Sequence, residues 1–153
     1  MNPEEPNQNK KEQAIELGKL ADFDQQYFES LEGKDGWIAL GHDEYENQQY
    51  FTGLSMSKEK VGIVGVYDKG SEQNILHYVV DPQYRGQGLA RKLTEQLMTK
   101  LNLPQVILTI DLDNKASIRA AEKLPGVEKV SDSGYEKEYH KIKFVYKRPV
   151  NAE

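Results

Sequence analysis

The segment VVDPQYRGQGLARKL, residues 79–93, constrains the fold more than any other part of the sequence. It begins with an apolar, β-branched run that ends at Asp81-Pro82, because proline cannot take part in strand pairing. From Gly86 onward a leucine recurs every fourth residue as far as Leu101, which predicts one buried face of a helix. We therefore expect a strand that passes through a tight glycine turn directly into a helix, as in an α/β sheet.

This turn predicts a binding site for an anion. A helix start exposes unpaired backbone N–H groups and the positive end of the helix dipole. Gly86 and Gly88 lack Cβ atoms, so an anion can approach the backbone closely, and Arg85, Arg91 and Lys92 add positive charge. A phosphate or pyrophosphate is the expected ligand. The alternative is a tight connection with a structural role only.

The remaining elements follow from periodicity and turn signals. Asp22 followed by Gln25 resembles a capping box at the first helix, and Asn114 stands where the cap of a later helix belongs. The apolar strand 106–110 lacks alternation, so we expect it to be covered on both faces. Strands are predicted at 14–20, 50–56, 61–67, 75–80, 106–110, 127–131 and 141–147, helices at 23–31, 86–101 and 115–124, and a loop or short helix at 36–49. This order predicts a mixed sheet with helices on both faces.

Composition limits the class of protein. A chain of 153 residues favours one domain, expected at 13–148, with a disordered leader at 1–12 and a tail at 149–153. The polar start has no apolar core typical of a secretion signal, no apolar run is long enough for a membrane span, and cysteine is absent. Together these features favour the cytoplasm and no membrane partner.

Charge is distributed unevenly along the chain. The formal net charge of −5 argues against a general nucleic-acid binder. Residues 1–50 carry 12 acidic and 4 basic side chains, whereas residues 85–148 carry 8 acidic and 13 basic ones. The two parts are suited to ligands of opposite sign, although solvated surface charge is an equally simple interpretation.

The glycine turn fits neither the Walker motif, because Gly88 is followed by Leu89-Ala90, nor the dinucleotide fingerprint, because Arg91 replaces its third glycine. RGQGLA, residues 85–90, instead resembles the Gln/Arg-x-x-Gly-x-Gly/Ala signature of the GNAT superfamily of N-acetyltransferases, and Val-Asp-Pro precedes it as in that family. LTIDLDN and AEKLPGV, farther along the chain, also resemble elements of this family. The resemblance spans roughly residues 50–130.

The resemblance implies an α/β (α+β) fold with a mostly antiparallel central sheet, a splayed parallel strand pair and acetyl-CoA as the cofactor. In that family backbone N–H groups of the turn hold the pyrophosphate, and the pantetheine arm pairs with the edge of the preceding strand at residues 78–80. The cofactor-binding residues implied in this way are Val79, Val80, Arg85, Gly86, Gln87, Gly88, Leu89, Ala90, Arg91, Asn114 and Ser117. For Asn114, helix capping alone is an equally good explanation.

The implied reaction is direct attack of a neutral amine on a thioester, helped by a backbone N–H near Val79 or Val80. This chain has Leu76 and Ala121 where many family members have a glutamate base and a tyrosine acid. We expect His77 and Tyr78 to be the catalytic replacements, with Asp111 more remote. For His77 the structural alternative is a satisfied, half-buried side chain.

The acceptor expected is a small cationic amine or a protein amino group, with Trp37 and Tyr45 beside an acidic cluster as candidate pocket residues. No metal site is predicted, because the three histidines lack metal-ligand spacing. The sequence leaves the oligomeric state open, a homodimer included. Two other functions stay open: a non-catalytic module that binds CoA, and a nucleotide-binding domain without acyl chemistry.

Overall fold

A computed structural model of the chain describes residues 15–32 and 44–148. The expected leader at 1–12 and tail at 149–153 lie outside the described residues, as do Trp37 and His42. Within the described parts the elements are β1 (Leu17–Asp22), α2 (Gln25–Glu32), β2 (Glu46–Ser55), β3 (Lys60–Lys69), β4 (Glu72–Val80), a short 3-10 helix η1 (Pro82–Tyr84), α3 (Leu89–Leu101), β5 (Gln105–Asp111), α4 (Lys115–Glu122), β6 (Glu128–Lys129), α5 (Ser133–Tyr139) and β7 (Lys141–Lys147).

These strands form one seven-stranded sheet in the order β1-β2-β3-β4-β5-β7-β6. The pairs are antiparallel except β4 and β5, which are parallel neighbours. The α3 crossover between β4 and β5 produces the parallel pair, since two parallel strands need a long connection. The predicted fold class, a mixed and mostly antiparallel sheet with one parallel pair, is therefore confirmed.

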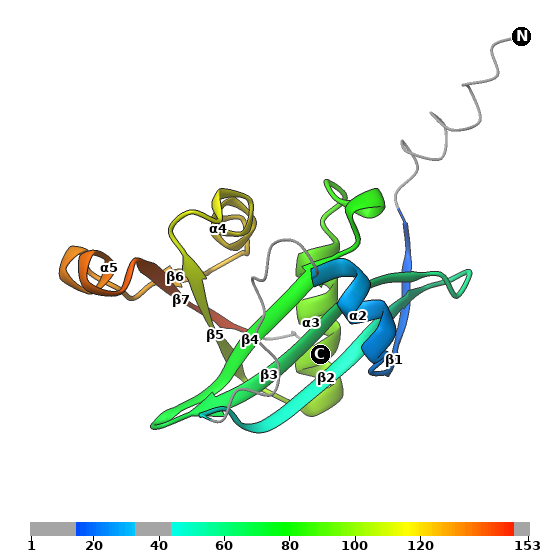
Figure 1. The fold of residues 1–153 in the computed structure, drawn as a ribbon, viewed down its shortest axis with the longest axis horizontal. Coiled ribbons are helices and arrows are strands. Elements are labelled where there is room, and N and C mark those ends of the chain that lie inside the picture. The colour runs from blue at the N-terminus through cyan, green and yellow to red at the C-terminus, as the bar shows by residue number, and fades with distance from the viewer. Residues whose placement is uncertain (1–14, 33–43, 149–153) are drawn as a thin grey trace, which may run out of the picture.

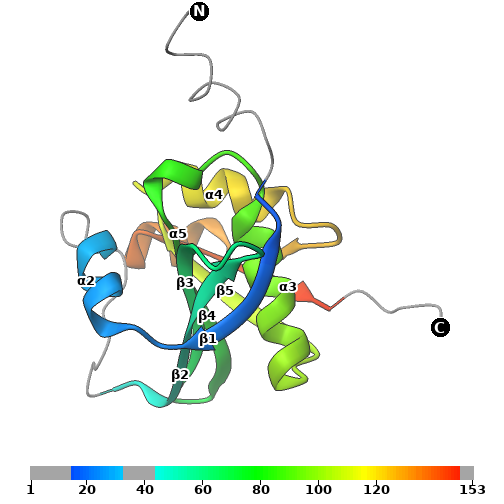
Figure 2. The same cartoon turned by 90° about the vertical axis from the view of Figure 1, so that its right-hand side faces the viewer.

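Helices cover both faces of the sheet, as expected. Figure 2 shows α2 on one side of the strands and α3 on the other. The alternation along β3 explains this arrangement: Ile63 packs with Phe28 of α2, whereas Val64 belongs to the core cluster that includes the leucines of α3. That larger core also contains Ala121 of α4.

The small helix α5 covers β7 on the face opposite the main core. The ammonium group of Lys143 lies 5.0 Å from the ring centre of Tyr135, while the neighbouring Ile142 and Phe144 point into the core. The sequence analysis missed α5. Its start has a recognisable cap, because the Asp132 side chain accepts a hydrogen bond from the Tyr135 amide.

Several expectations need correction. Helix α3 begins at Leu89, not at Gly86, and η1 lies between it and β4. The cap of α2 is Asp24, which accepts from the Tyr27 amide at 3.0 Å, whereas Asp22 belongs to β1. Strand β5 is buried at every second residue and half-buried between them, so it is not fully covered on both faces. The expected strand at 127–131 is only two residues long. Residues 46–49, expected in a loop or short helix, are the first residues of β2.

None of the helices in the described ranges is long and apolar enough to cross a membrane.

Candidate active site

The site is built where β4 and β5 separate. The two strands are paired in register only at Ile75 and Ile107, near the start of each strand. In Figure 1 the two strands diverge toward their C-terminal ends, β4 toward the turn before α3 and β5 toward α4. Beyond Ile75 the described residues record no further β5 partner for β4, so this part of β4 has an unpaired edge.

The strand register shows which backbone groups of β4 face the split, which is the space between the separating strands β4 and β5. The Asp81 amide donates to the Val61 carbonyl of β3 at 2.8 Å, and bonding alternates along an antiparallel pair. The backbone groups of Val79 therefore point toward β3, whereas those of Tyr78 and Val80 point into the split. The sequence analysis expected an amide near Val79 or Val80 to stabilise the thioester oxygen. Of these two residues only Val80 has its amide on the unpaired edge, and the Tyr78 amide lies on the same edge.

The unpaired edge and the start of α3 line the same cleft, although η1 lies between them in the chain. Gly88 is the N-cap, in the left-handed conformation with φ 75°, and no side chain caps this helix. A glycine adopts this conformation without the strain that a Cβ would cause. The Lys92 amide donates to the Gly88 carbonyl, so the amides of the residues between them lie in the first turn, before the intrahelical bonds begin. Several N–H groups and the positive end of the helix dipole thus remain available for an anion.

A cleft of about 240 Å³ joins these features. Its lining comes from three elements: the edge of β4, the glycine turn and the first turn of α4. The lining residues are Tyr78, Val79, Val80, Arg85, Gly86, Gly88, Leu89, Ala90, Asn114, Ala116 and Ser117. The structure thus brings together most residues of the expected cofactor site. Ala116 was missed, and the only signal for it was its place beside the capping asparagine.

The α4 wall of the cleft combines capping with available donors. The side-chain Oδ1 of Asn114 accepts a hydrogen bond from the Ser117 amide at 3.3 Å, which makes Asn114 the N-cap of α4. Capping uses this oxygen, so the amide nitrogen of the side chain is the part that a ligand can reach. The Ser117 hydroxyl contacts the Tyr78 side chain across the cleft. Burial raises the pKa of Tyr78, and the contact with Ser117 partly offsets the effect, so the phenol keeps its proton at neutral pH.

Three side chains near the turn have partners within the protein. The Arg85 Nε donates to the Val80 carbonyl at 3.1 Å. Gln87, which does not line the cleft, accepts from the Ile15 amide at 2.7 Å and so connects the turn to the residues before β1. Arg91 pairs with Glu95 at 2.9 Å and also lies outside the cleft lining. Of the three residues, only Arg85 lines the cleft.

A family model for the acetyltransferase (GNAT) domain matches residues 16–126, which is most of the chain. The chain belongs to the GNAT acetyltransferase family. The predicted enzyme class, an N-acetyltransferase, agrees with this membership. No curated protein sequence matches the chain closely enough to serve as a relative.

Solved GNAT structures share the fold at low identity. A chimera of the spermidine N-acetyltransferase SpeG from Vibrio cholerae and hSSAT is 14% identical, with a TM-score of 0.64 over 86% of this chain and 95% of that chain. An acetyltransferase from Agrobacterium tumefaciens is 15% identical, with a TM-score of 0.63 over 89% and 94%. A GNAT-family acetyltransferase from Bordetella pertussis is 18% identical, with a TM-score of 0.57 over 88% and 99%.

The two positions where GNAT enzymes often carry their acid and base are apolar here. Leu76 is 4% exposed and Ala121 is fully buried, and both belong to the main core. Neither side chain can move a proton. Any proton transfer by this GNAT chain must therefore use other groups.

His77 lies on the other face of β4 from Tyr78, within a cluster of tyrosines. Its Nδ1 is 3.3 Å from the Tyr50 hydroxyl, and its ring centre is 4.5 Å from that of Tyr67, on which Tyr45 stacks at 3.9 Å. Burial, with a smaller contribution from the charge of Lys141, lowers the pKa of His77 to about 4. The imidazole is therefore neutral at pH 7. His77 does not line the cleft, although it belongs to β4, the strand that forms one edge of the cleft.

Asp81 is a structural residue of the site that the sequence analysis missed. It is 8% exposed, and its carboxylate accepts from the Tyr27 hydroxyl at 2.9 Å and the Gln83 amide at 3.1 Å. These bonds connect α2 to the turn that follows β4. A signal was present in the sequence, because an aspartate before a proline at a strand end is typical of a cap.

Asp111, Asp113 and His140 meet at the end of β5, next to the N-cap of α4. Their ligand atoms all lie within 4.8 Å of one another, and the His140 Nε2 is 3.2 Å from Asp113. One imidazole and two carboxylates are able to bind a divalent cation, a grouping that sequence spacing did not indicate. The three side chains are half-buried to exposed and also form simple ion pairs when His140 is protonated.

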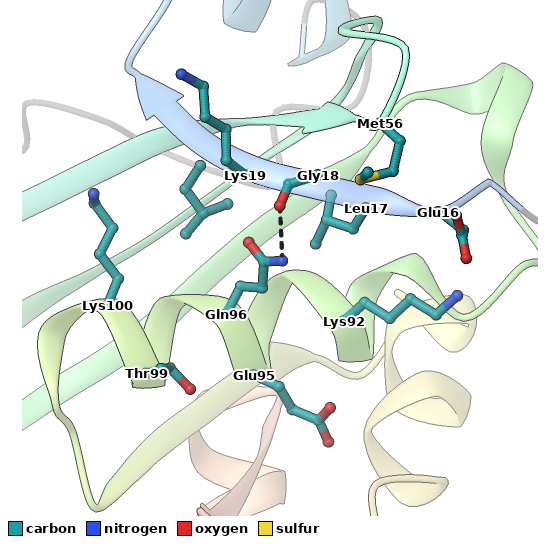
Figure 3. Close-up of a pocket in the computed structure, with 11 residues that line it drawn as sticks. Glu16, Leu17, Gly18, Lys19, Met56, Lys92, Glu95, Gln96, Thr99 and Lys100 are labelled. Atoms are coloured by element: carbon teal, nitrogen blue, oxygen red, sulfur yellow. Dashed lines mark hydrogen bonds between the residues drawn. The ribbon is translucent and has the colours of Figure 1, made fainter.

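A wider groove of about 1030 Å³ lies between β1 and α3, on a different part of the surface (Figure 3). Gln96 of α3 donates to the Gly18 carbonyl of β1 across it at 3.3 Å. Figure 3 shows the Glu95 side chain pointing away from β1, consistent with its bonds to Arg91 and Tyr146. None of the residues that the family resemblance assigns to the cofactor lines this groove, but Lys92, expected to add positive charge to the anion site, lines the groove and not the cleft.

Proposed function

We propose that this GNAT chain transfers the acetyl group of acetyl-CoA to a primary amine, either a small cationic amine or a protein amino group, by direct attack. The main observation in support is that the unpaired edge of β4 and the uncapped start of α3 line one cleft. An extended amide chain fits the edge, and a diphosphate fits the helix start.

The residues present fit acetyl-CoA. Backbone groups of Tyr78 and Val80 are oriented to pair with the amides of the pantetheine arm, and the first-turn amides of α3 are oriented to bind the pyrophosphate. The cleft of about 240 Å³ is below the roughly 300–1,000 Å³ of ordinary ligand pockets, so we expect it to enclose part of the molecule only. When bound, acetyl-CoA supplies the acetyl group as an activated thioester.

His77 and Tyr78 are consecutive residues of a strand, so their side chains point to opposite faces of the sheet. This suits direct attack, in which the amine approaches from one side and the thiolate departs on the other. We assign His77 the role of base toward the amine proton, directly or through water, and Tyr78 that of proton donor to sulfur. A carbon–nitrogen bond forms, the carbon–sulfur bond breaks, and the products are an N-acetylamine and a free thiol.

The acceptor class rests on two observations. Residues 1–50 carry a formal charge of −8, which attracts a cation. In addition, the fold is similar to that of proteins named as spermidine N-acetyltransferases from Vibrio cholerae. Polyamines therefore belong in the first panel of acceptors, together with peptides that have a free amino terminus.

A second candidate is a non-catalytic module that binds CoA. It is favoured by the burial of Leu76 and Ala121 at the usual acid and base positions. Calorimetric titration with acetyl-CoA and CoA, followed by an acetyl-CoA turnover screen over diverse amines with a free-thiol readout, separates the two functions. We expect binding and thiol release. Binding without turnover on any amine would favour the module, and no binding of either form would contradict both.

A further inference from the structure

We propose that Asp111, Asp113 and His140 form a binding site for a divalent transition-metal ion such as Zn²⁺. The inference goes beyond the proposed acetyl transfer and does not depend on it. It rests on the donor set and its geometry. One imidazole nitrogen and two carboxylate oxygens, from two separate segments of the chain, lie within 4.8 Å of one another.

The distances between the donor atoms fit a single bound ion. Ligand atoms about 2.1 Å from a tetrahedral Zn²⁺ lie about 3.4 Å apart. The His140 Nε2 is 3.2 Å from the Asp113 Oδ1 and 3.8 Å from the Asp111 Oδ1. Small rotations of the side chains are therefore enough to bring all three donors onto one ion.

Backbone hydrogen bonds hold the two segments together at this place. The Leu112 amide donates to the His140 carbonyl at 3.1 Å. Asp111 is paired with Lys141, the residue after His140, in the register of β5 and β7. The Asp113 amide donates to the Asp111 Oδ1 at 2.8 Å, which orients that carboxylate. Ligands that are already oriented lose less conformational freedom when a metal binds.

The donor set determines the class of metal. Carboxylates and water suit Mg²⁺ or Ca²⁺, whereas an imidazole nitrogen favours Zn²⁺, Co²⁺ or Ni²⁺. The imidazole also distinguishes these three residues from a group of surface acids. The side chains are 34% exposed for Asp111, 58% for His140 and 75% for Asp113, which leaves access for the ion and space for water ligands.

The expectation of no metal site rested on the spacing of the histidines alone. That spacing gives no information on carboxylates that the fold brings to a single histidine. Asp113 directly precedes Asn114, the N-cap of α4 and a lining residue of the cleft. His140 is the C-cap of α5, and β7 begins at the next residue. A bound ion therefore connects the loop before α4 to the junction of α5 and β7 and stabilises the folded chain.

The test is calorimetric titration of the full chain, freed of metal and without an affinity tag, with Zn²⁺ and separately with Mg²⁺. We expect one equivalent of Zn²⁺ to bind, and Mg²⁺ to bind about 10-fold or more weakly. His140→Asn and Asp113→Asn should each weaken the binding of Zn²⁺ by about 10- to 100-fold, because a ligand is lost. Asparagine tolerates the left-handed conformation of His140, whose φ is 55°, so the fold should be retained.

Two control variants remove the same chemical groups elsewhere. His77→Gln removes an imidazole that lies in the tyrosine cluster, and Glu122→Gln removes an exposed carboxylate at the far end of α4. Both variants should bind Zn²⁺ as the wild type does. Thermal unfolding is a second readout, because Zn²⁺ should raise the midpoint of the wild type and not that of His140→Asn.

The inference is overturned if the wild type binds no Zn²⁺, since the three side chains then form ion pairs only. Binding that is unchanged in His140→Asn, or an equal rise of the midpoint in both proteins, also overturns it, because the ion then lies elsewhere. Equal affinities for Zn²⁺ and Mg²⁺ would contradict the nitrogen ligand. Each of these results leaves the proposed acetyl transfer intact, because no measurement involves acetyl-CoA.

Discussion

At the scale of single residues, neighbours in the sequence have different environments. Tyr78 faces the cleft and Ser117, whereas His77 faces Tyr50 and Tyr67 on the other side of the sheet. This separation follows from the two-residue period of a strand. It assigns the two proton transfers of the proposed reaction to different faces, which makes each residue testable by itself.

Tyr78→Phe removes the phenol hydroxyl and leaves the ring. We expect kcat to fall by about 10²- to 10³-fold, because a positioned proton donor is lost, while the affinity for acetyl-CoA is retained. Steady-state kinetics and calorimetry measure these two quantities. Tyr139→Phe, at a tyrosine that is 53% exposed on α5, is the control and should leave both unchanged. A kcat within threefold of the wild type would exclude Tyr78 as the donor.

His77 predicts a pH dependence of stability. Its pKa is about 4 in the folded protein and near 6.5 in an unfolded chain, so between these values the unfolded state binds more protons. The free energy of unfolding therefore falls as the pH decreases from 6.5 to 4, by as much as about 3 kcal/mol from this group. Urea unfolding of the wild type and of His77→Gln at several pH values measures it. We expect a shallower dependence in the variant, and identical slopes would contradict the burial of a neutral imidazole.

At the scale of elements, the site depends on how β4 ends and α3 begins. The proline after Asp81 ends the strand, and the left-handed Gly88 starts the helix without a side-chain cap. The strand end and the helix start each leave backbone N–H or C=O groups that have no hydrogen-bond partner within the same strand or helix. A helix capped by serine or aspartate would be more stable but would have fewer donors left for a ligand.

Gly88→Asp places a negative charge at this helix start, and we expect it to abolish measurable binding of acetyl-CoA. A Cβ at Gly88 meets no atom within 4 Å, so the charge and the backbone conformation, not a collision, are the cause. Gly88→Asn is the matched control, because asparagine tolerates the left-handed region and is neutral. Calorimetric titration of both variants with acetyl-CoA measures the two affinities and separates the effect of the charge from that of the side chain. An affinity of Gly88→Asp within twofold of the wild type would refute the position assigned to the pyrophosphate.

At the scale of the whole molecule, the position of β4 depends on how α3 and the neighbouring strands pack. Helix α3 packs closely on the sheet, and Leu93 fills the space above Gly53 and Gly62. Gly62 also lies against the backbone of β4. The position of the β4 edge therefore depends on small residues in the neighbouring strands.

Gly62→Ala tests this dependence. Its Cβ would lie 2.5 Å from the Val79 carbonyl oxygen, a backbone atom that cannot turn aside. We expect a loss of about 1–3 kcal/mol in the free energy of unfolding, together with weaker binding of acetyl-CoA as β4 shifts. Gly53→Ala is the comparison, since its Cβ meets the end of the Leu93 side chain, which is able to rotate. If Gly53→Ala proved the more damaging, this account of the packing would be wrong.

Much of the architecture was predictable because it is encoded locally. Proline and glycine positions determined where β4 ends and α3 begins, and leucine spacing determined the buried face of α3. Short elements were harder: β6 is only two residues long, and α5 has no buried residue to give a hydrophobic period. The cap of α2 was placed two residues early, because Asp22 and Asp24 both precede the helix and only tertiary contacts distinguish them.

The sequence by itself determined the order of the elements, the glycine turn and the absence of the usual acid and base. Each of these depends on residue types at fixed spacing along the chain. Only the tertiary structure decided which backbone groups of β4 face the split, that Arg85 contacts Val80, and that Tyr78 rather than His77 lines the cleft. These facts depend on strand register and on contacts between distant segments, and neither is encoded in the spacing of neighbouring residues.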